Sequence, residues 1–142
     1  MARRDVVRAV CGTVTLWAVL ACVVACGTGS TPPKSPGARL YAANCLACHQ
    51  ANGQGVAGVQ PPLAGTPVPL GDPNALIGWV LYGERPSTLP RGQYSGVMPQ
   101  FSYLSDNDLA VLLTYVRSSF GNQAGAVTPE MVAAVRAARH GG

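Results

Sequence analysis

Two cysteines and a histidine that stand close together carry the clearest chemical signal in this sequence. Cys45 and Cys48 are separated by two residues, and His49 follows directly, in the run CLACH. If this segment is helical, the three residues stand at i, i+3 and i+4 and share one face. The two thiols can then add to the two vinyl groups on one edge of a porphyrin, and the imidazole can reach the iron. The C-x-x-C-H spacing therefore predicts one covalently attached haem c.

Two other chemistries use similar residues. A redox cysteine pair of the thioredoxin kind stands in a βαβ context, and the sequence shows no such alternation. A structural zinc site takes four ligands, whereas the motif supplies three. The remaining histidine, His140, lies in the terminal run RHGG, and the adjacent Cys48 and His49 would fit poorly into one tetrahedral site. The residues favour haem attachment over both alternatives.

A second iron ligand can be sought among the three methionines. Met1 belongs to the start of the chain, and Met131 lies in an expected helix beyond the haem domain. Met98 stands in the run GVMPQ, where Pro99 prevents a helix from running through, and enough chain separates it from Cys48 to pass around a haem. We predict that Met98 ligates the iron, the alternative being a methionine that fills a gap in the core. A thioether ligand raises the reduction potential relative to two histidines.

With these residues in place, the chain resembles class I cytochrome c over about residues 37–120. The features that carry the resemblance are Gly37 and Tyr41, the haem motif, Pro61-Pro62-Leu63-Ala64-Gly65, Val97-Met98-Pro99 and the Leu109–Tyr115 stretch. The resemblance implies an all-α fold of helices and Pro/Gly-rich loops around one haem. It also implies that the carbonyl of Pro61 accepts a hydrogen bond from His49 and so fixes the imidazole tautomer. A simple turn proline is the alternative.

Capping residues and apolar spacing predict the helices that position the motif. A short helix over 39–49 runs into the motif. Asp72 is a candidate N-cap with Pro73 at the first helical position, and Gly83 should end that helix. Ser105 should cap a helix with apolar residues at 109, 112, 113 and 116 that ends near Phe120. The resemblance implies that this last helix crosses the first, with Tyr41 packed near Leu112, Tyr115 or Val116.

A further helix is expected after the haem domain. Thr128 and Pro129 form an N-cap followed by proline, and the helix should continue to about Arg139. This C-terminal extension is similar to that of cytochrome c domains that accompany periplasmic dehydrogenases, terminal oxidases or copper nitrite reductases. It is either a helix packed on the domain surface or a dedicated docking element.

The first 25 residues have the composition of an export signal. Three arginines precede Ala9–Ala25, which carries no charge. The run VVAC ending at Cys26 resembles the lipobox of bacterial lipoproteins, in which the cysteine is lipidated. An uncleaved membrane anchor and a released protein are the alternatives. All three predict export, to the periplasm or the outer face of the cytoplasmic membrane.

The sequence thus predicts four parts in order. Residues 1–25 are the signal or anchor, 26–36 a Gly/Ser/Pro linker, 37–121 the haem domain and 122–142 a helical extension. The haem domain is small and rich in loops, so its core should depend on the haem, and the haem-free domain should be poorly folded.

The charge of the chain argues against one class of partner. The 142 residues carry a formal net charge of +4, but no run of basic residues, so a nucleic-acid partner is not expected. From Cys26 onward there are seven basic and five acidic side chains, so part of the positive charge belongs to the signal. Candidate partners of the haem propionates are Trp79, Arg85, Arg91 and Tyr94, although solvated charges and core aromatics are the simpler interpretation.

The predicted function is single-electron transfer between redox proteins, through a haem with both axial ligands retained and without catalysis. Small apolar residues near the motif could form the docking patch: Ala47, Ala51, Val56 and Val97. One alternative is a haem subunit of a larger oxidoreductase. Another is a ligand-binding haem sensor or weak peroxidase, which requires an open sixth position. Met98 and the lack of a distal histidine argue against the last.

Overall fold

A computed structural model describes residues 34–141 of the chain. The predicted export signal over 1–25, the lipidation candidate Cys26 and most of the 26–36 linker lie outside the described residues. Within 34–141 the chain forms helices joined by loops, with one isolated bridge between Val56 and Gln60 and no strand. The all-α prediction is confirmed. In this part of the chain, no helix combines the length and the apolar character that a bilayer crossing needs.

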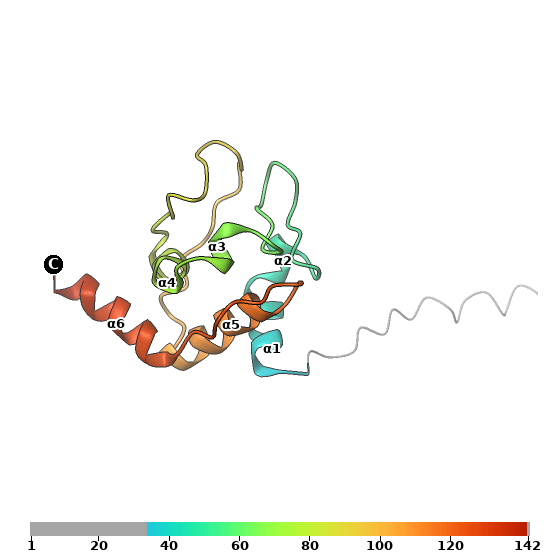
Figure 1. The fold of residues 1–142 in the computed structure, drawn as a ribbon. Coiled ribbons are helices and arrows are strands. Elements are labelled where there is room, and N and C mark those ends of the chain that lie inside the picture. The colour runs from blue at the N-terminus through green and yellow to red at the C-terminus, as the bar shows by residue number, and fades with distance from the viewer. Residues whose placement is uncertain (1–33, 142) are drawn as a thin grey trace, which may run out of the picture. The chain divides into compact units, whose positions relative to one another are not determined.

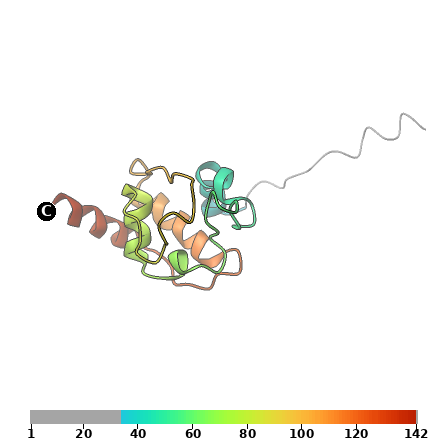
Figure 2. The same ribbon diagram turned by 90° about the horizontal axis from the view of Figure 1, so that it is seen from above.

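The crossing of α1 (Pro36–Asn44) with α5 (Asp106–Ser118) forms the base of the domain (Figures 1 and 2). A Cβ at Gly37 would lie 2.6 Å from the Cβ of Tyr115, so only glycine allows the two helices this close. The ring centroids of Tyr41 and Tyr115 are 5.6 Å apart, which confirms the predicted packing. The Ser105 hydroxyl accepts a hydrogen bond from the N–H of Asp108 at 3.1 Å, so the predicted cap is confirmed.

The expected single helix over 39–49 is wrong, because the chain breaks at Cys45. The first helix begins earlier than predicted, since the Ser35 hydroxyl caps it by accepting a hydrogen bond from the N–H of Ala38 at 3.2 Å. It ends at Asn44, and a separate turn, α2 (Leu46–His49), follows. Cys45 has φ −120° and ψ −29°, outside helical geometry. Its carbonyl nevertheless accepts a hydrogen bond from the N–H of His49 at 2.9 Å, so the motif folds as a turn of its own.

The middle of the chain contains one predicted helix and one that was missed. The predicted helix is α4 (Pro73–Tyr82), with Asp72 as N-cap and Gly83 in the left-handed conformation at its end. The missed helix is α3 (Pro67–Leu70), a single turn. Its two prolines made the segment look like a loop in the sequence. Pro67 at the first helical position fits the helix, because its missing N–H would have had no partner there.

The last helix, α6 (Pro129–His140), packs on α5 and on α4. The Thr128 hydroxyl accepts a hydrogen bond from the N–H of Met131 at 3.4 Å, as the predicted cap requires. Two long loops, 50–66 and 83–105, rise away from α1 and α5 in Figure 1, and the second then runs back to the start of α5. Residues of both loops line the cavity that forms the candidate site.

Candidate functional site

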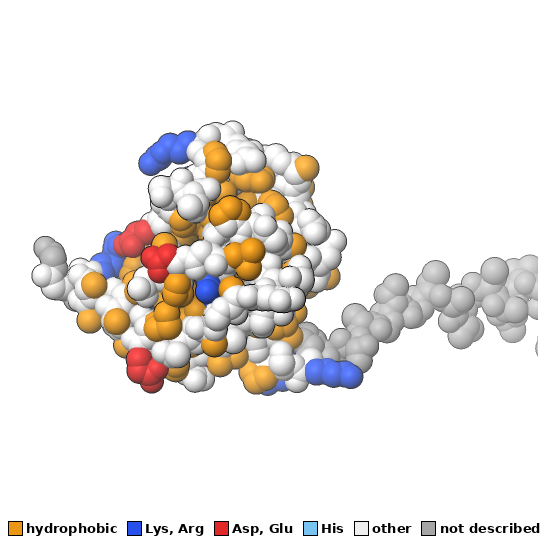
Figure 3. Space-filling view, viewed as in Figure 1, with side chains coloured by type: hydrophobic (Ala, Val, Ile, Leu, Met, Phe, Trp, Pro, Cys, Tyr) orange, Lys and Arg blue, Asp and Glu red, His pale blue; other side chains and the backbone are white. Residues whose placement is uncertain are grey.

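The two loops and the helices below them enclose a cavity of about 660 Å³. Its floor is apolar and comes from α4 and α5, with Leu76, Val80, Leu112 and Val116 among the lining residues. In Figure 3, hydrophobic side chains lie recessed between the loops on this face. Among the residues that line the cavity, Arg85 is the one with a full charge. The cavity therefore suits a large, mostly apolar group with an acidic substituent near Arg85.

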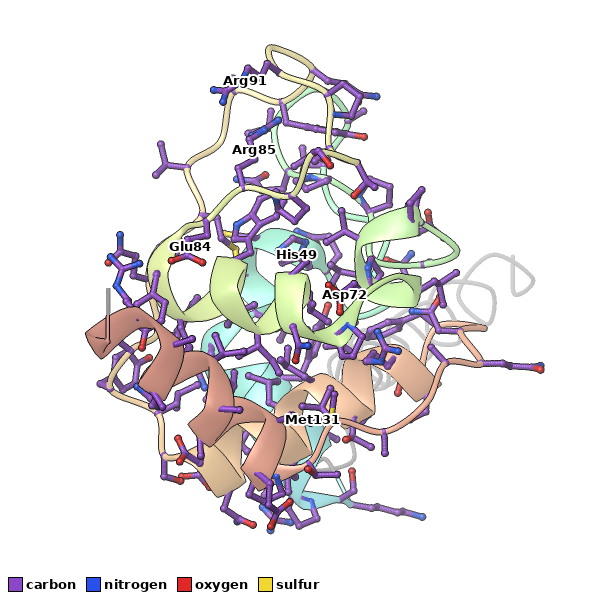
Figure 4. All side chains as sticks on the ribbon, turned by 60° about the vertical axis from the view of Figure 1, so that its left-hand side comes forward. His49, Asp72, Glu84, Arg85, Arg91 and Met131 are labelled. Atoms are coloured by element: carbon purple, nitrogen blue, oxygen red, sulfur yellow. The ribbon has the colours of Figure 1, made fainter. Side chains whose placement is uncertain are left out.

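His49 enters this cavity from α2 with its ring orientation fixed (Figure 4). Its Nδ1 lies 3.0 Å from the carbonyl oxygen of Pro61. A carbonyl can only accept, so Nδ1 carries the proton and Nε2 keeps its lone pair. Burial lowers the pKa of His49, and the bond to Pro61 opposes this in part. The ring is thus held neutral in the tautomer that a metal ligand requires.

The thiols of Cys45 and Cys48 line the same cavity and are not joined as a disulfide. Burial, and then the neighbouring Cys48, raise the pKa of the Cys45 thiol to about 11. Two reduced thiols and a neutral imidazole from one short turn therefore face one apolar space. This donor set fits a haem bound through two thioether links and one axial nitrogen.

Met98 also lines the cavity, from the loop between α4 and α5. Met131 does not belong to the lining; it lies on α6 and packs against the core (Figure 4). Of these two methionines, Met98 shares the cavity with His49 and Met131 does not; the ligation of an iron by Met98 stays a prediction. His49 and Met98 stand far apart in the sequence, before and after α4, and the fold brings them to one cavity.

The candidate propionate partners separate into two groups. Trp79, Arg85 and Tyr94 line the cavity, whereas Arg91 does not and lies at the outer end of its loop (Figure 4). The guanidinium carbon of Arg85 lies 5.7 Å from the centroid of the Trp79 ring. Arg85 also donates to the carbonyl oxygens of Leu89 and Pro90. This leaves part of its guanidinium fork for an acidic group.

Two buried polar residues that sequence reasoning missed hold segments of the chain that lie next to the cavity lining. Asn122 donates through Nδ2 to the carbonyl oxygens of Leu63 and Val116, at 3.0 and 2.9 Å. Its Oδ1 accepts a hydrogen bond from the N–H of Gly65 at 2.8 Å. These bonds fasten the segment that follows Pro61 to the end of α5.

Arg117 is the second of these residues, and it is 5% exposed. It donates to the carbonyl oxygens of Pro69 and Gly71 at 2.7 and 3.0 Å, and to that of Gly125 at 2.7 Å. One signal was present in the sequence, because Arg117 stands four residues after Leu113, on the apolar stripe of its helix. An arginine on a buried stripe needs internal acceptors.

The sequence model of the cytochrome c family matches residues 35–120. The chain belongs to the cytochrome c family. Its cofactor is accordingly covalent haem c, and it is an extracytoplasmic electron carrier rather than an enzyme. Membership also decides between haem and the zinc or thioredoxin-like interpretations of the cysteines.

Known cytochromes of several kinds are similar to the chain. Cytochrome c-552 of Thermus thermophilus is 37% identical over 94 residues, which is 63% of this chain and 71% of that protein. The fructose dehydrogenase cytochrome subunit of Gluconobacter japonicus is 38% identical over 109 residues, 71% of this chain and 22% of that protein. The cbb3-type cytochrome c oxidase subunit FixP of Azorhizobium caulinodans is 33% identical over 99 residues, 67% of this chain and 30% of that protein. The chain thus spans most of one relative and a minor part of the other two.

Proposed function

We propose that this cytochrome c is a membrane-tethered carrier of single electrons between redox proteins, with His49 and Met98 as the axial ligands of its haem. The observation that supports this most directly is that an imidazole with a free Nε2 and a thioether line one cavity. In this proposal Cys45 and Cys48 hold the haem covalently, and Pro61 orients His49. The haem iron supplies the redox chemistry by changing between ferric and ferrous states.

The protein's own residues keep the iron environment constant while the charge changes. His49 donates to a backbone carbonyl, which strengthens the ring as a ligand and prevents its rotation. Met98 offers a soft, neutral sulfur that favours the ferrous state. The apolar floor excludes water from the cavity. If His49 and Met98 both hold the iron, they would leave no position on it for a substrate.

Visible spectroscopy of the purified holoprotein tests the ligation. We expect a low-spin ferric spectrum with the methionine-to-iron charge-transfer band, and loss of that band in Met98→Ala. Met131→Ala is the matched control, since Met131 is not part of the cavity lining, and it should keep the band. A high-spin ferric spectrum in the wild-type protein would refute the carrier proposal and favour the ligand-binding sensor.

The surface near the motif supports a partner that docks through uncharged contacts. Residues 40–71 contain no Lys, Arg, Asp or Glu. The members of the predicted docking patch, Ala47, Ala51, Val56 and Val97, are all exposed, and Val97 is 89% exposed. We expect electron transfer to the partner to depend weakly on ionic strength, because exposed charges set the salt dependence of association.

The named relatives point to the partner class. The similar subunits belong to a fructose dehydrogenase and a cbb3-type oxidase, so the partner is a redox enzyme of that kind. The C-terminal extension over 122–142 suggests a copper nitrite reductase as a third candidate. If the chain is instead a fixed subunit of such a complex, it will co-purify with it at high salt. Mass spectrometry of the mature N-terminus distinguishes a lipid on Cys26 from an uncleaved anchor over 1–25 and from a released protein.

A further inference from the structure

Arg136 on α6 makes an unusual set of bonds to the segment that follows the proposed methionine ligand. Its Nη1 donates to the carbonyl oxygen of Ser102 at 3.1 Å, and its Nη2 to that of Leu104 at 2.5 Å. Its Nε donates to the Asp106 carboxylate at 2.7 Å, and the Arg136 side chain is 24% exposed. One guanidinium therefore binds two carbonyls of the tight turn over 101–104 and the first residue of α5.

This turn is the anchor for the chain on the C-terminal side of Met98. The N–H of Phe101 donates to the carbonyl of Val80 at 2.9 Å, and the N–H of Leu104 to that of Phe101 at 3.1 Å. On the other side of Met98, the N–H of Gly96 donates to the carbonyl of Val59 at 2.8 Å. Between these anchors, residues 97–100 form no backbone hydrogen bond with another described residue. The position of Met98 therefore depends on how firmly the anchors are held.

We propose that Arg136 is a positioning residue for Met98, one that keeps the thioether at the iron by holding the turn over 101–104. The inference rests on the proposed His/Met ligation. A guanidinium is suited to this task because its donors lie in one fixed plane and reach separate oxygens at set angles, whereas the three donors of a lysine share one nitrogen on a flexible stem. Loss of Arg136 frees the turn, and Met98 then leaves the iron more often.

The chain offers a matched control three residues further along the same helix. Arg139 pairs with Glu84 and lies over the ring of Tyr82, with its guanidinium carbon 4.2 Å from the ring centroid. These contacts join α6 to the end of α4 and do not touch the turn after Met98. Arg139→Ala therefore weakens the attachment of α6 without removing the bonds that we assign to Met98.

Ligand exchange on the ferric holoprotein tests the proposal. Imidazole binds the iron only after the methionine has left, so the binding rate at saturating imidazole reports the rate at which Met98 dissociates. We expect Arg136→Ala to raise this rate about tenfold, on the scale of losing one charge-assisted hydrogen bond. We expect Arg136→Lys to give an intermediate rate, and Arg139→Ala to stay within about twofold of wild type.

Three results would overturn either the proposal or the His/Met ligation on which it rests. If Arg136→Ala and Arg136→Lys exchange at the wild-type rate while their thermal stability falls, Arg136 has a structural role only. If Arg139→Ala accelerates exchange as much as Arg136→Ala, the docking of α6 as a whole is responsible. If the wild-type protein lacks the methionine charge-transfer band, the His/Met ligation itself is wrong, which is distinguishable from both other failures. Should Arg136→Ala not fold, the Lys variant carries the comparison.

Discussion

Asn122 offers the sharpest test of how the domain holds its first cavity loop. The side chain is 4% exposed and forms three hydrogen bonds, two to the carbonyls of Leu63 and Val116 and one from the N–H of Gly65. Val116 lies in the last turn of α5, where carbonyls lack partners within the helix. Asn122→Ala therefore leaves the buried carbonyl of Val116 and the part-buried carbonyl of Leu63 unpaired at once.

The expected loss follows from those bonds. Each net intramolecular hydrogen bond contributes about 0.5–1.5 kcal/mol, and an unpaired buried group costs somewhat more. Gly65 is exposed, so its N–H can turn to water, and two bonds dominate. We expect the free energy of unfolding of the holoprotein to fall by roughly 2–3 kcal/mol, with an unchanged denaturant slope.

Guanidinium chloride denaturation, followed by far-UV circular dichroism, measures this loss. Asn107→Ala is the matched control, because Asn107 is exposed near the start of α5, and it should change stability by less than about 0.5 kcal/mol. An Asn122→Ala variant as stable as the Asn107→Ala control would refute the reasoning, since the buried amide would then contribute nothing to the loop.

Three further predictions concern other parts of the domain. Arg117→Met leaves the carbonyls of Pro69, Gly71 and Gly125 without their donor, so the free energy of unfolding should fall by roughly 2–4 kcal/mol; a denaturation midpoint equal to that of the wild type would contradict the assignment. Gly37→Ala places a Cβ 2.6 Å from Tyr115, so overpacking should cost about 1–3 kcal/mol despite the better helix propensity of alanine, measured by the same titration. Removal of the haem should leave a domain without a cooperative thermal transition; native-like calorimetric unfolding of the haem-free chain would refute this.

The sequence predicts the haem motif and the longer helices because their signals are local. The spacing of Cys45, Cys48 and His49 follows from the geometry of one helical turn. The caps Asp72 and Ser105 act within three residues of their own position, so they too can be read from short windows. In each case, the residue and its partner are neighbours in the chain.

The sequence does not predict two features, the break at Cys45 and the helix α3, because both depend on backbone geometry that composition does not encode. The break at Cys45 keeps the hydrogen bond from its N–H to the carbonyl of Tyr41 at 2.8 Å, so it changes dihedral angles without changing the apolar pattern. The turn over Pro67–Leu70 has too few residues to show a helical period. Neither feature produces a periodic spacing of apolar residues from which it could be predicted.

The positioning residues escape prediction for a different reason: their acceptors are backbone carbonyls. Asn122 and Leu63 are 59 residues apart, and Arg117 and Pro69 are 48 apart. Every residue supplies a carbonyl, so no residue type in the partner segment marks the contact. Such pairs become visible only once the fold places the segment beside the side chain.

These carbonyl contacts bear on what the segment after residue 121 contributes to the site. Asn122 fixes the loop that contains Pro61, which orients His49, and Arg136 fixes the turn that follows Met98. A side chain of the C-terminal segment thus holds the loop beside each of the two proposed axial ligands, and so positions that ligand indirectly. Because a thioether ligand binds ferric iron weakly, the rigidity of its loop matters most in that state. In this proposal the C-terminal segment affects electron transfer by keeping the same two ligands bound to the iron in both oxidation states. This role does not require the segment to contact a partner.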